Sequence, residues 1–324
     1  MQSRTADRLG RPLSVIGLGT WQLGADWGDV SERDATAILE ASVESGVTVF
    51  DTADVYGDGR SEQIIGAFIR THPGVFVATK MGRRLEQVPE NYSMANFRAW
   101  TDRSRANLGV DTLDLVQLHC PPTAVIESDR VFDDLDTLVA EGAIARYGVS
   151  VETADQALAA IARPGVASVQ IILNAFRLKP LDAVLPAADE AGVAIIARVP
   201  LASGLLSGKY TADTQFAAND HRTFNRHGEA FDVGEKFSGV DFEGGVAAAQ
   251  EFSAIAASAG LSAPVEALAG VAQIPGVTTV IPGARSVDQA RSNASAGSVE
   301  GLDITPAVTD LYDRYFRAAI HDRW

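Results

Sequence analysis

Two hydrophobic patterns alternate along the chain. Short runs rich in β-branched residues recur, and the longer stretches between them carry apolar residues at the spacing of an amphipathic helix. The short runs contain few polar residues, which is typical of parallel strands that are buried on both faces. We predict eight such strands: VIGLGT (15–20), VTVFDT (47–52), VFVATK (75–80), LDLVQLH (113–119), ARYGVS (145–150), SVQIILN (168–174), VAIIARV (193–199) and TTVIPG (278–283).

Helix start and stop signals lie in the first segments between these strands. Ser31, Ser61 and Ser93 each precede a stretch with helical apolar spacing, and serine is a favoured residue at the N-cap. Gly46 and Gly109 follow the last apolar residue of two of these stretches, where glycine commonly ends a helix. The chain is therefore predicted to alternate strands with helices.

This alternation predicts a parallel α/β fold. A doubly wound sheet and a closed barrel both fit the pattern, and the count of eight strands together with the length of 324 residues favours a single-domain (β/α)8 TIM barrel over residues 1–324. A long polar loop with interspersed aromatic residues, about 207–243, separates the seventh and eighth strands. It is either a lid over a ligand or a surface insertion.

Composition narrows the function classes. The chain has 27 Lys and Arg against 42 Asp and Glu, a net charge of −15, which argues against nucleic acid or an anionic membrane as the main partner. Cys120 is the single cysteine, so no internal disulfide forms, and neither a signal-like N-terminus nor an apolar run of membrane-spanning length is present. We expect a cytoplasmic protein.

Four polar residues stand at or just after the ends of three successive predicted strands. Asp51 ends the second strand and Tyr56 follows on the next loop, Lys80 ends the third strand, and His119 ends the fourth. In a barrel the C-terminal strand ends form the catalytic face, so these side chains are expected to meet at one centre. Each residue alone also has an ordinary structural explanation, as a cap, a loop aromatic, an exposed charge or a core histidine.

Together the four groups suit general acid catalysis. A phenol has an unperturbed pKa of about 10, and a neighbouring ammonium lowers it by stabilising the phenolate. A carboxylate would fix the ammonium, and an imidazole could orient a substrate oxygen. The set could therefore protonate the alkoxide that forms when a carbonyl is reduced.

The motifs around these residues resemble the aldo-keto reductase superfamily, in particular its bacterial members with a long lid. They are GLGTWQLG (17–24), FDTADVYGDGRSEQIIG (50–66), VATK (77–80), LDLVQLHCPP (113–122), GVS (148–150), VPLASGLLSGKY (199–210) and IPGARSVDQARSN (281–293). The resemblance spans nearly the whole chain. It implies a barrel that binds NADPH and reduces an aldehyde or ketone, with Tyr56 as proton donor, Asp51 and Lys80 as the charge pair, and His119 orienting the carbonyl.

The resemblance also implies a cofactor site, with Arg285 as the partner of the 2′-phosphate because a guanidinium matches phosphate geometry. NADH is expected to bind less well. The implied substrate-binding residues are Trp21, Tyr56 and His119. The implied cofactor-binding residues are Thr20, Trp21, Asp51, Ser150, Gln170, Arg198, Val199, Leu201, Ser203, Gly204, Lys209, Gly283, Arg285, Gln289 and Asn293.

Two positions depart from the family pattern. Val151 stands where the family often has an asparagine that contacts the nicotinamide, and Arg198 stands where many members stack an aromatic ring on it. A guanidinium can also stack on a ring. Its charge would disfavour the oxidised, cationic nicotinamide, and we expect this to favour reduction.

Two rival functions remain open at this stage. Lys80 could serve a barrel lyase as a Schiff-base amine, or the barrel could bind NADPH as a non-catalytic regulatory subunit. No metal site is expected, because His221 and His227 lie close in sequence without an accompanying ligand pattern. The basic segment MGRR (81–84) fits either an anionic carbonyl substrate or a solvated charge cluster. We expect a monomer or a weak homo-oligomer.

Overall fold

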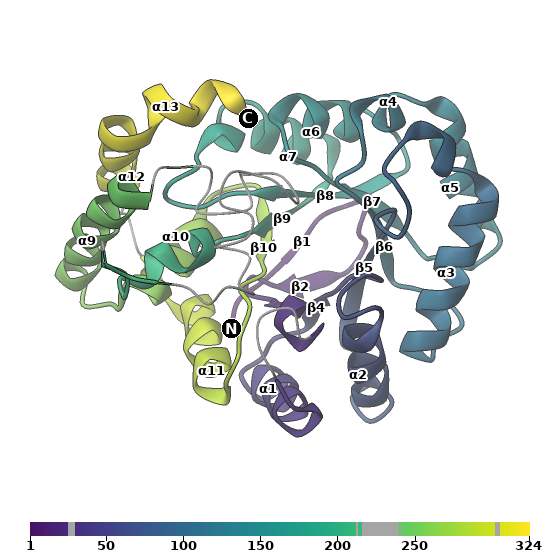
Figure 1. The fold of residues 1–324 in the computed structure, drawn as a ribbon, viewed down its shortest axis with the longest axis horizontal. Helices are drawn as coiled ribbons and strands as arrows, with labels where there is room; N and C mark the ends of the chain where they lie inside the picture. Colours follow the sequence, from purple (N-terminus) through teal and green to yellow (C-terminus); the bar gives the residue numbers. More distant parts are fainter. Residues whose placement is uncertain (25–29, 212, 216–239, 241, 302–304) are drawn as a thin grey trace.

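The computed structural model describes residues 1–24, 30–211, 213–215, 240, 242–301 and 305–324. Figure 1 shows a ring of strands at the centre with helices around it, which is the arrangement of a TIM barrel. The barrel strands are β3 (Leu18–Gly19), β4 (Val49–Asp51), β5 (Phe76–Met81), β6 (Leu115–His119), β7 (Tyr147–Ser150), β8 (Val166–Ile172), β9 (Ala194–Arg198) and β10 (Val277–Val280).

The eight strands pair in sequence order, and every pairing is parallel. Parallel bridges between Ile16 and Val280 and between Gly19 and Gly283 join the two edges of the sheet. The predicted (β/α)8 barrel is therefore confirmed, and each of the eight predicted strands overlaps one strand of the sheet.

The strand register aligns polar side chains at the C-terminal end of the barrel. His119 on β6 pairs with Ser150 on β7, and Ser150 in turn pairs with Gln170 on β8. Because paired residues of neighbouring parallel strands point to the same face of a sheet, these three side chains face the same way near the C-terminal end of the barrel.

Helices cover the outside of the barrel and bury their apolar faces against it (Figure 1). They are α1 (Glu32–Glu44), α2 (Arg60–Ile69), α3 (Met94–Leu108), α4 (Thr123–Ile126), α5 (Asp129–Ala140), α6 (Ala154–Ile161), α7 (Val184–Ala191), α9 (Phe242–Ser258), α10 (Ala263–Gln273), α11 (Val287–Ser295), α12 (Thr305–Tyr312) and α13 (Ala318–Ile320).

The three predicted serine caps have different outcomes. Ser31 caps α1, since its side chain accepts a hydrogen bond from the backbone N–H of Asp34. Ser93 occupies the N-cap of α3, but its side chain makes no capping hydrogen bond. The prediction for Ser61 is wrong: α2 begins at Arg60, and Ser61 is fully buried with its hydroxyl bonded to threonines of the barrel.

An antiparallel hairpin that the strand pattern did not predict precedes the barrel. It consists of β1 (Ser3–Thr5) and β2 (Pro12–Ser14). Leu9, in its turn, and Leu13 are fully buried in one cluster with Phe76 and Leu115 of the barrel strands. The hairpin therefore adds its leucines to an apolar cluster shared by several barrel strands.

Most of the predicted lid, including His221 and His227, lies outside the described residues. The helix that follows it, α9, begins at Phe242. Over the described ranges, no single helix is long and apolar enough to cross a membrane, although α9 and α10 pass that test as a pair bent by 81°. Those same ranges hold no cluster of three or more His, Cys, Asp or Glu residues that could bind a metal.

Candidate active site

A cavity of about 600 Å³ is built by the C-terminal ends of the barrel strands and the loops that follow them. Its wall contains every residue that the sequence assigned to catalysis, substrate or cofactor except Lys80, which is buried behind the wall. These lining residues are Thr20, Trp21, Asp51, Tyr56, His119, Ser150, Gln170, Arg198, Val199, Leu201, Ser203, Gly204, Lys209, Gly283, Arg285, Gln289 and Asn293.

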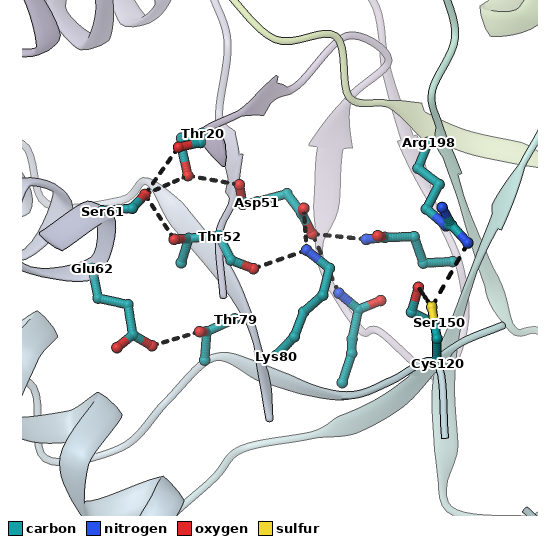
Figure 2. A network of polar contacts seen from close by, with 12 residues as sticks. Thr20, Asp51, Thr52, Ser61, Glu62, Thr79, Lys80, Cys120, Ser150 and Arg198 are labelled. Carbon is teal, nitrogen blue, oxygen red and sulfur yellow. Dashed lines mark hydrogen bonds and ion pairs between the residues drawn. The ribbon is translucent and has the colours of Figure 1, made fainter. Parts of the chain in front are cut away.

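Asp51 and Lys80 form a buried ion pair at the floor of this cavity (Figure 2). The Lys80 ammonium donates to the Asp51 carboxylate at 2.5 Å and to the backbone oxygen of Thr52 at 2.8 Å. Their side chains are only 1% and 4% exposed. Removing one partner would leave the other charge buried without compensation, so the two positions depend on each other.

The lysine stays protonated in this position. Burial by itself lowers the pKa of Lys80, but the Asp51 carboxylate and the Tyr56 phenol outweigh burial and raise the pKa above its usual value. The ammonium also lies 5.2 Å from the centre of the Tyr56 ring. A persistent positive charge therefore stands next to the phenol.

Tyr56 lies on the loop between β4 and α2, and that loop is held by a close backbone contact. Gly57, with a φ of +58°, packs against Gly24 so tightly that a Cβ on Gly57 would stand 2.1 Å from the Gly24 carbonyl oxygen. Only glycine fits such an approach at a positive φ. The loop that carries Tyr56 is thereby fixed against the loop that follows β3.

Two rings flank the phenol. Trp21 stacks on Tyr56 with ring centres 5.9 Å apart and an interplanar angle of 16°. The His119 ring meets Tyr56 edge-on, with a centre-to-centre distance of 6.0 Å. Both residues line the cavity, so the phenol sits between an aromatic wall and an imidazole.

The histidine is neutral. Burial, reinforced by the positive charges of Arg83, Lys80 and Arg198, holds the pKa of His119 well below its usual range. Its Nδ1 atom is buried and has no hydrogen-bond partner among the described residues. A neutral imidazole can donate a hydrogen bond from one nitrogen only, which suits it to orient a carbonyl oxygen without competing as an acid.

Buried hydroxyl groups join β3, β4 and α2 beneath the cavity (Figure 2). Thr20 donates to the backbone oxygen of Asp51 at 2.8 Å, and Ser61 donates to the Thr20 hydroxyl at 2.9 Å. Thr52 donates to the Ser61 hydroxyl at 2.9 Å. This chain of bonds explains why Ser61 is buried, and it ties the backbone of Asp51 to the two neighbouring elements.

Two glutamines hold the second carboxylate oxygen of Asp51. The Gln170 amide donates to it at 2.7 Å and the Gln117 amide at 3.3 Å. Gln170 was expected to bind the cofactor, and in the structure its side-chain amide donates to Asp51. Gln117 was missed, although a polar residue two positions before His119 in an apolar strand shares the face of His119.

Arg198 is paired with a carboxylate that the sequence did not indicate. Its guanidinium bonds to Glu152 at 3.1 Å and to the backbone oxygen of Val151 at 3.1 Å. Val151 therefore differs from the family's asparagine in its side chain only, because its backbone carbonyl accepts a hydrogen bond from Arg198. Since Glu152 offsets the charge of Arg198, the expected bias against an oxidised nicotinamide becomes weaker.

The segment after β9 contains several residues in the left-handed backbone region. Val199, Ala202 and Ser203 have φ values of 53°, 47° and 53°. For a β-branched residue such as Val199 this is a strained conformation. Strain of this kind is concentrated at ligand-binding loops, which fits a segment that wraps a ligand.

The N-terminus of α11 supplies the exposed part of the cavity wall. Ser286 caps the helix by accepting from the backbone N–H of Gln289, and Gln289 accepts from the backbone N–H of Arg285 at 2.8 Å. Asn293 is buried and donates to the Gly283 oxygen at 3.1 Å. An exposed guanidinium next to a helix N-terminus is a suitable place for a phosphate.

The model of the Aldo/keto reductase family matches residues 15–305 of the chain. The protein belongs to this family. An uncharacterized oxidoreductase of Mycobacterium tuberculosis is 32% identical over 315 residues, covering 93% of this chain and 89% of that protein. The resemblance that the sequence motifs indicated is thus confirmed.

Solved structures of aldo-keto reductases have the same architecture. The glycerol dehydrogenase AKR11B4 from Gluconobacter oxydans is 28% identical, with a TM-score of 0.77 over 98% of this chain and 96% of that one. An aldo-keto reductase from Klebsiella pneumoniae in complex with NADPH is 24% identical, with a TM-score of 0.70 over 97% and 96% of the two chains. At 24% identity, the similarity to the Klebsiella pneumoniae protein shows a shared fold alone.

Proposed function

We propose that the protein is an NADPH-dependent reductase that converts an aldehyde or ketone into an alcohol, with Tyr56 as the general acid. One observation carries the proposal: a phenol and a neutral histidine meet at one cavity wall, and a protonated lysine is buried directly behind the phenol. A carbonyl oxygen placed between Tyr56 and His119 would receive a hydrogen bond from each side. Both donors would lie where negative charge develops on that oxygen.

The proton follows a short path. Tyr56 donates its phenolic proton to the carbonyl oxygen, and the phenolate that remains is stabilised by the Lys80 ammonium. Asp51 keeps the lysine charged and in place through the 2.5 Å ion pair. When bound, reduced nicotinamide supplies the hydride that the carbonyl carbon accepts.

The residues present fit this cofactor. The exposed Arg285, at the N-terminus of α11, and Lys209 offer positive charge at the cavity wall for phosphate groups. The left-handed backbone around Ser203 and Gly204 presents a small-residue segment for close approach. NADPH is also the ligand of the Klebsiella relative. Arg198, next to Ser150 on the neighbouring part of the wall, would pack on the nicotinamide.

The alternative function, a barrel lyase that forms a Schiff base on Lys80, requires a lysine that loses its proton readily. Lys80 has a raised pKa and is held by Asp51, which disfavours a Schiff-base amine. Borohydride reduction in the presence of a carbonyl compound should therefore leave no adduct on Lys80.

The deciding experiment follows NADPH absorbance with a panel of aldehydes and ketones. Tyr56→Phe keeps the ring that stacks on Trp21 but removes the proton, so kcat should fall by about 10²- to 10⁴-fold. The Kd of NADPH, measured by fluorescence, should stay nearly unchanged. If no carbonyl compound consumes NADPH while NADPH still binds, the regulatory alternative takes the place of this proposal.

A further inference from the structure

The loop between β4 and α2, which carries Tyr56, has a backbone that few residues adopt. Gly57, Asp58 and Gly59 have φ values of 58°, 51° and 95°, so successive residues lie in the left-handed region. Glycine enters this region without a steric penalty, whereas aspartate is one of the few other residues that tolerate it. Such a backbone persists where surrounding contacts over-determine it. The loop that holds the phenol therefore depends on contacts from other parts of the chain.

Two arginines from different elements converge on this loop. Arg84, on the loop after β5, donates to the Asp58 carboxylate at 2.8 Å. Arg103, on α3, donates to the same carboxylate oxygen at 3.0 Å and to the backbone oxygen of Asp58 at 2.6 Å. The hydrogen bond from Arg84 and the charge of Arg103 lower the pKa of Asp58, so its carboxylate is ionised. We call Asp58, Arg84 and Arg103 the clamp.

The arginines of the clamp also contact the chain on the other side of Tyr56. Both donate to the backbone oxygen of Asp54, Arg84 at 3.3 Å and Arg103 at 3.4 Å. These bonds are longer and weaker than the bonds to Asp58. Asp54 precedes Tyr56 in the loop and Asp58 follows it. The same two side chains therefore hold the backbone on both sides of the phenol.

The clamp connects Tyr56 to the strand that carries Lys80. Arg84 closely follows β5, which ends at Met81, and the backbone N–H of Asp54 donates to the backbone oxygen of Lys80 at 3.1 Å. The Lys80 ammonium lies 5.2 Å from the centre of the Tyr56 ring. A movement of the loop away from β5 would therefore separate the phenol from the ammonium.

The clamp lies outside the cavity wall, near the protein surface. None of its residues lines the cavity, and the Asp58 side chain is 78% exposed. Exposed ion pairs contribute little to the free energy of unfolding, because water and salt screen them. A displacement of about 1 Å in a reacting group can nevertheless lower a rate by about 10²-fold. The clamp is therefore expected to affect the reaction more than the stability of the fold.

We propose that Asp58, Arg84 and Arg103 are positioning residues, which hold the loop in the conformation that places the Tyr56 phenol against the substrate. This inference rests on the proposed function and adds residues that act on the reaction through Tyr56. Arg84 of the basic segment MGRR therefore has an intramolecular role, in place of the substrate contact or solvated charge that the sequence left open.

Asp58→Asn tests the clamp with a small change in shape. Asparagine tolerates the left-handed region as aspartate does, but it lacks the negative charge that two guanidinium groups share. With saturating NADPH, kcat should fall about tenfold or more. The Kd of NADPH and the midpoint of urea unfolding should stay nearly unchanged. Adding Arg103→Gln to Asp58→Asn should lower kcat little further, because both changes break the same interaction.

A matched control is available on the same helix. Arg98, also on α3, forms an ion pair with Glu141 at the surface, away from the loop that carries Tyr56. Arg98→Gln removes the same kind of charge and the same kind of contact as Arg103→Gln. It should leave kcat as in the unchanged protein.

Hydrogen exchange makes the inference independent of turnover. Within the loop, the backbone N–H of Tyr56 donates to the Ala53 oxygen and that of Arg60 to the Gly57 oxygen, both at 3.1 Å. In Asp58→Asn, exchange of these two amides should become about tenfold faster or more, because the loop opens more often. The amides of β8 should exchange as in the unchanged protein.

The outcomes separate the clamp from the reductase function. Unchanged kcat in Asp58→Asn, an equal loss in Arg98→Gln, or a loss of kcat without faster exchange in the loop would overturn the proposal. A midpoint of unfolding that falls together with kcat would show a role in global stability instead. Failure of every carbonyl compound to consume NADPH with the unchanged protein contradicts the reductase function, and the exchange rates then still show whether the clamp holds the loop.

Discussion

The two sides of the cavity are held in place by different means. On the side of β4, β5 and β6, Asp51, Lys80 and His119 are buried side chains, and Asp51 alone binds Lys80, Gln117 and Gln170. On the side of β9, β10 and α11, the wall consists of strained backbone and exposed residues such as Arg285. Groups that must stay within a fraction of an ångström of a reacting atom need dense support, whereas a wall for a cofactor that enters and leaves must stay accessible.

The largest effect should come from breaking the buried pair. Lys80→Met leaves the Asp51 carboxylate buried without a cation, and the free energy of unfolding should fall by about 3–5 kcal/mol. Urea denaturation measures the change. Adding Asp51→Asn should restore part of the loss, because the uncompensated charge is then gone.

Arg285→Ala is the matched change on the accessible side. Because the residue is exposed, its removal should alter the free energy of unfolding by no more than about 0.5 kcal/mol. Similar losses for Lys80→Met and Arg285→Ala would remove the contrast between the two sides.

A second prediction concerns a buried acid near Tyr56. Asp54 is fully buried, and both of its carboxylate oxygens have no hydrogen-bond partner among the described residues. Burial, followed by the charge of Glu62, raises the pKa of Asp54 to about 7, against the opposing effect of Arg84 and Arg103. The side of the cavity formed by β4, β5 and β6 therefore contains a carboxyl group, that of Asp54, whose ionised form is destabilised by the fold.

The sign of the pH dependence follows from that raised pKa. Between pH ~4 and ~7 the unfolded chain releases the Asp54 proton while the folded chain retains it, so stability falls as pH rises through this window. The Asp54→Asn side chain does not titrate, so this variant avoids the loss of stability. Its free energy of unfolding relative to the unchanged protein should therefore increase by about 2–3 kcal/mol from pH 5 to pH 8. Urea denaturation at the two pH values tests this, and an equal gain at both would show that Asp54 titrates normally.

The last prediction concerns the binding of the cofactor at the accessible side. Arg285→Ala should weaken NADPH by on the order of 1–3 kcal/mol while leaving NADH nearly unchanged, because only NADPH carries the 2′-phosphate. Fluorescence titration with both nucleotides measures the two constants. Equal losses for both would mean that Arg285 does not contact that phosphate.

The strands and the residues of the buried side could be predicted from the sequence because both depend on local pattern. Runs such as VFVATK have few other states available in a compact domain, and Asp51, Lys80 and His119 stand at the strand ends themselves. The hairpin at Ser3–Ser14 escaped prediction because its strands are short and partly polar and one contains a proline.

Pairings between distant strand ends could not be predicted. Glu152 follows β7 and Arg198 ends β9, and their contact depends on how the loops at the barrel mouth fold. Ser61 carries the sequence signature of a cap, yet the helix begins one residue earlier, at Arg60, and hydrogen bonds to Thr20 and Thr52 give Ser61 a different role. Such outcomes depend on tertiary contacts that local propensity does not encode.

The contact between Gly24 and Gly57 limits how this enzyme family member could change its substrate range. Because the two loops touch through backbone atoms, a new side chain or an insertion beside Trp21 would displace the loop that holds the tyrosine. Positions on the cavity wall outside these two loops do not depend on that backbone contact, so substitutions there are the easier route to other substrates. Libraries for directed evolution should start at those positions.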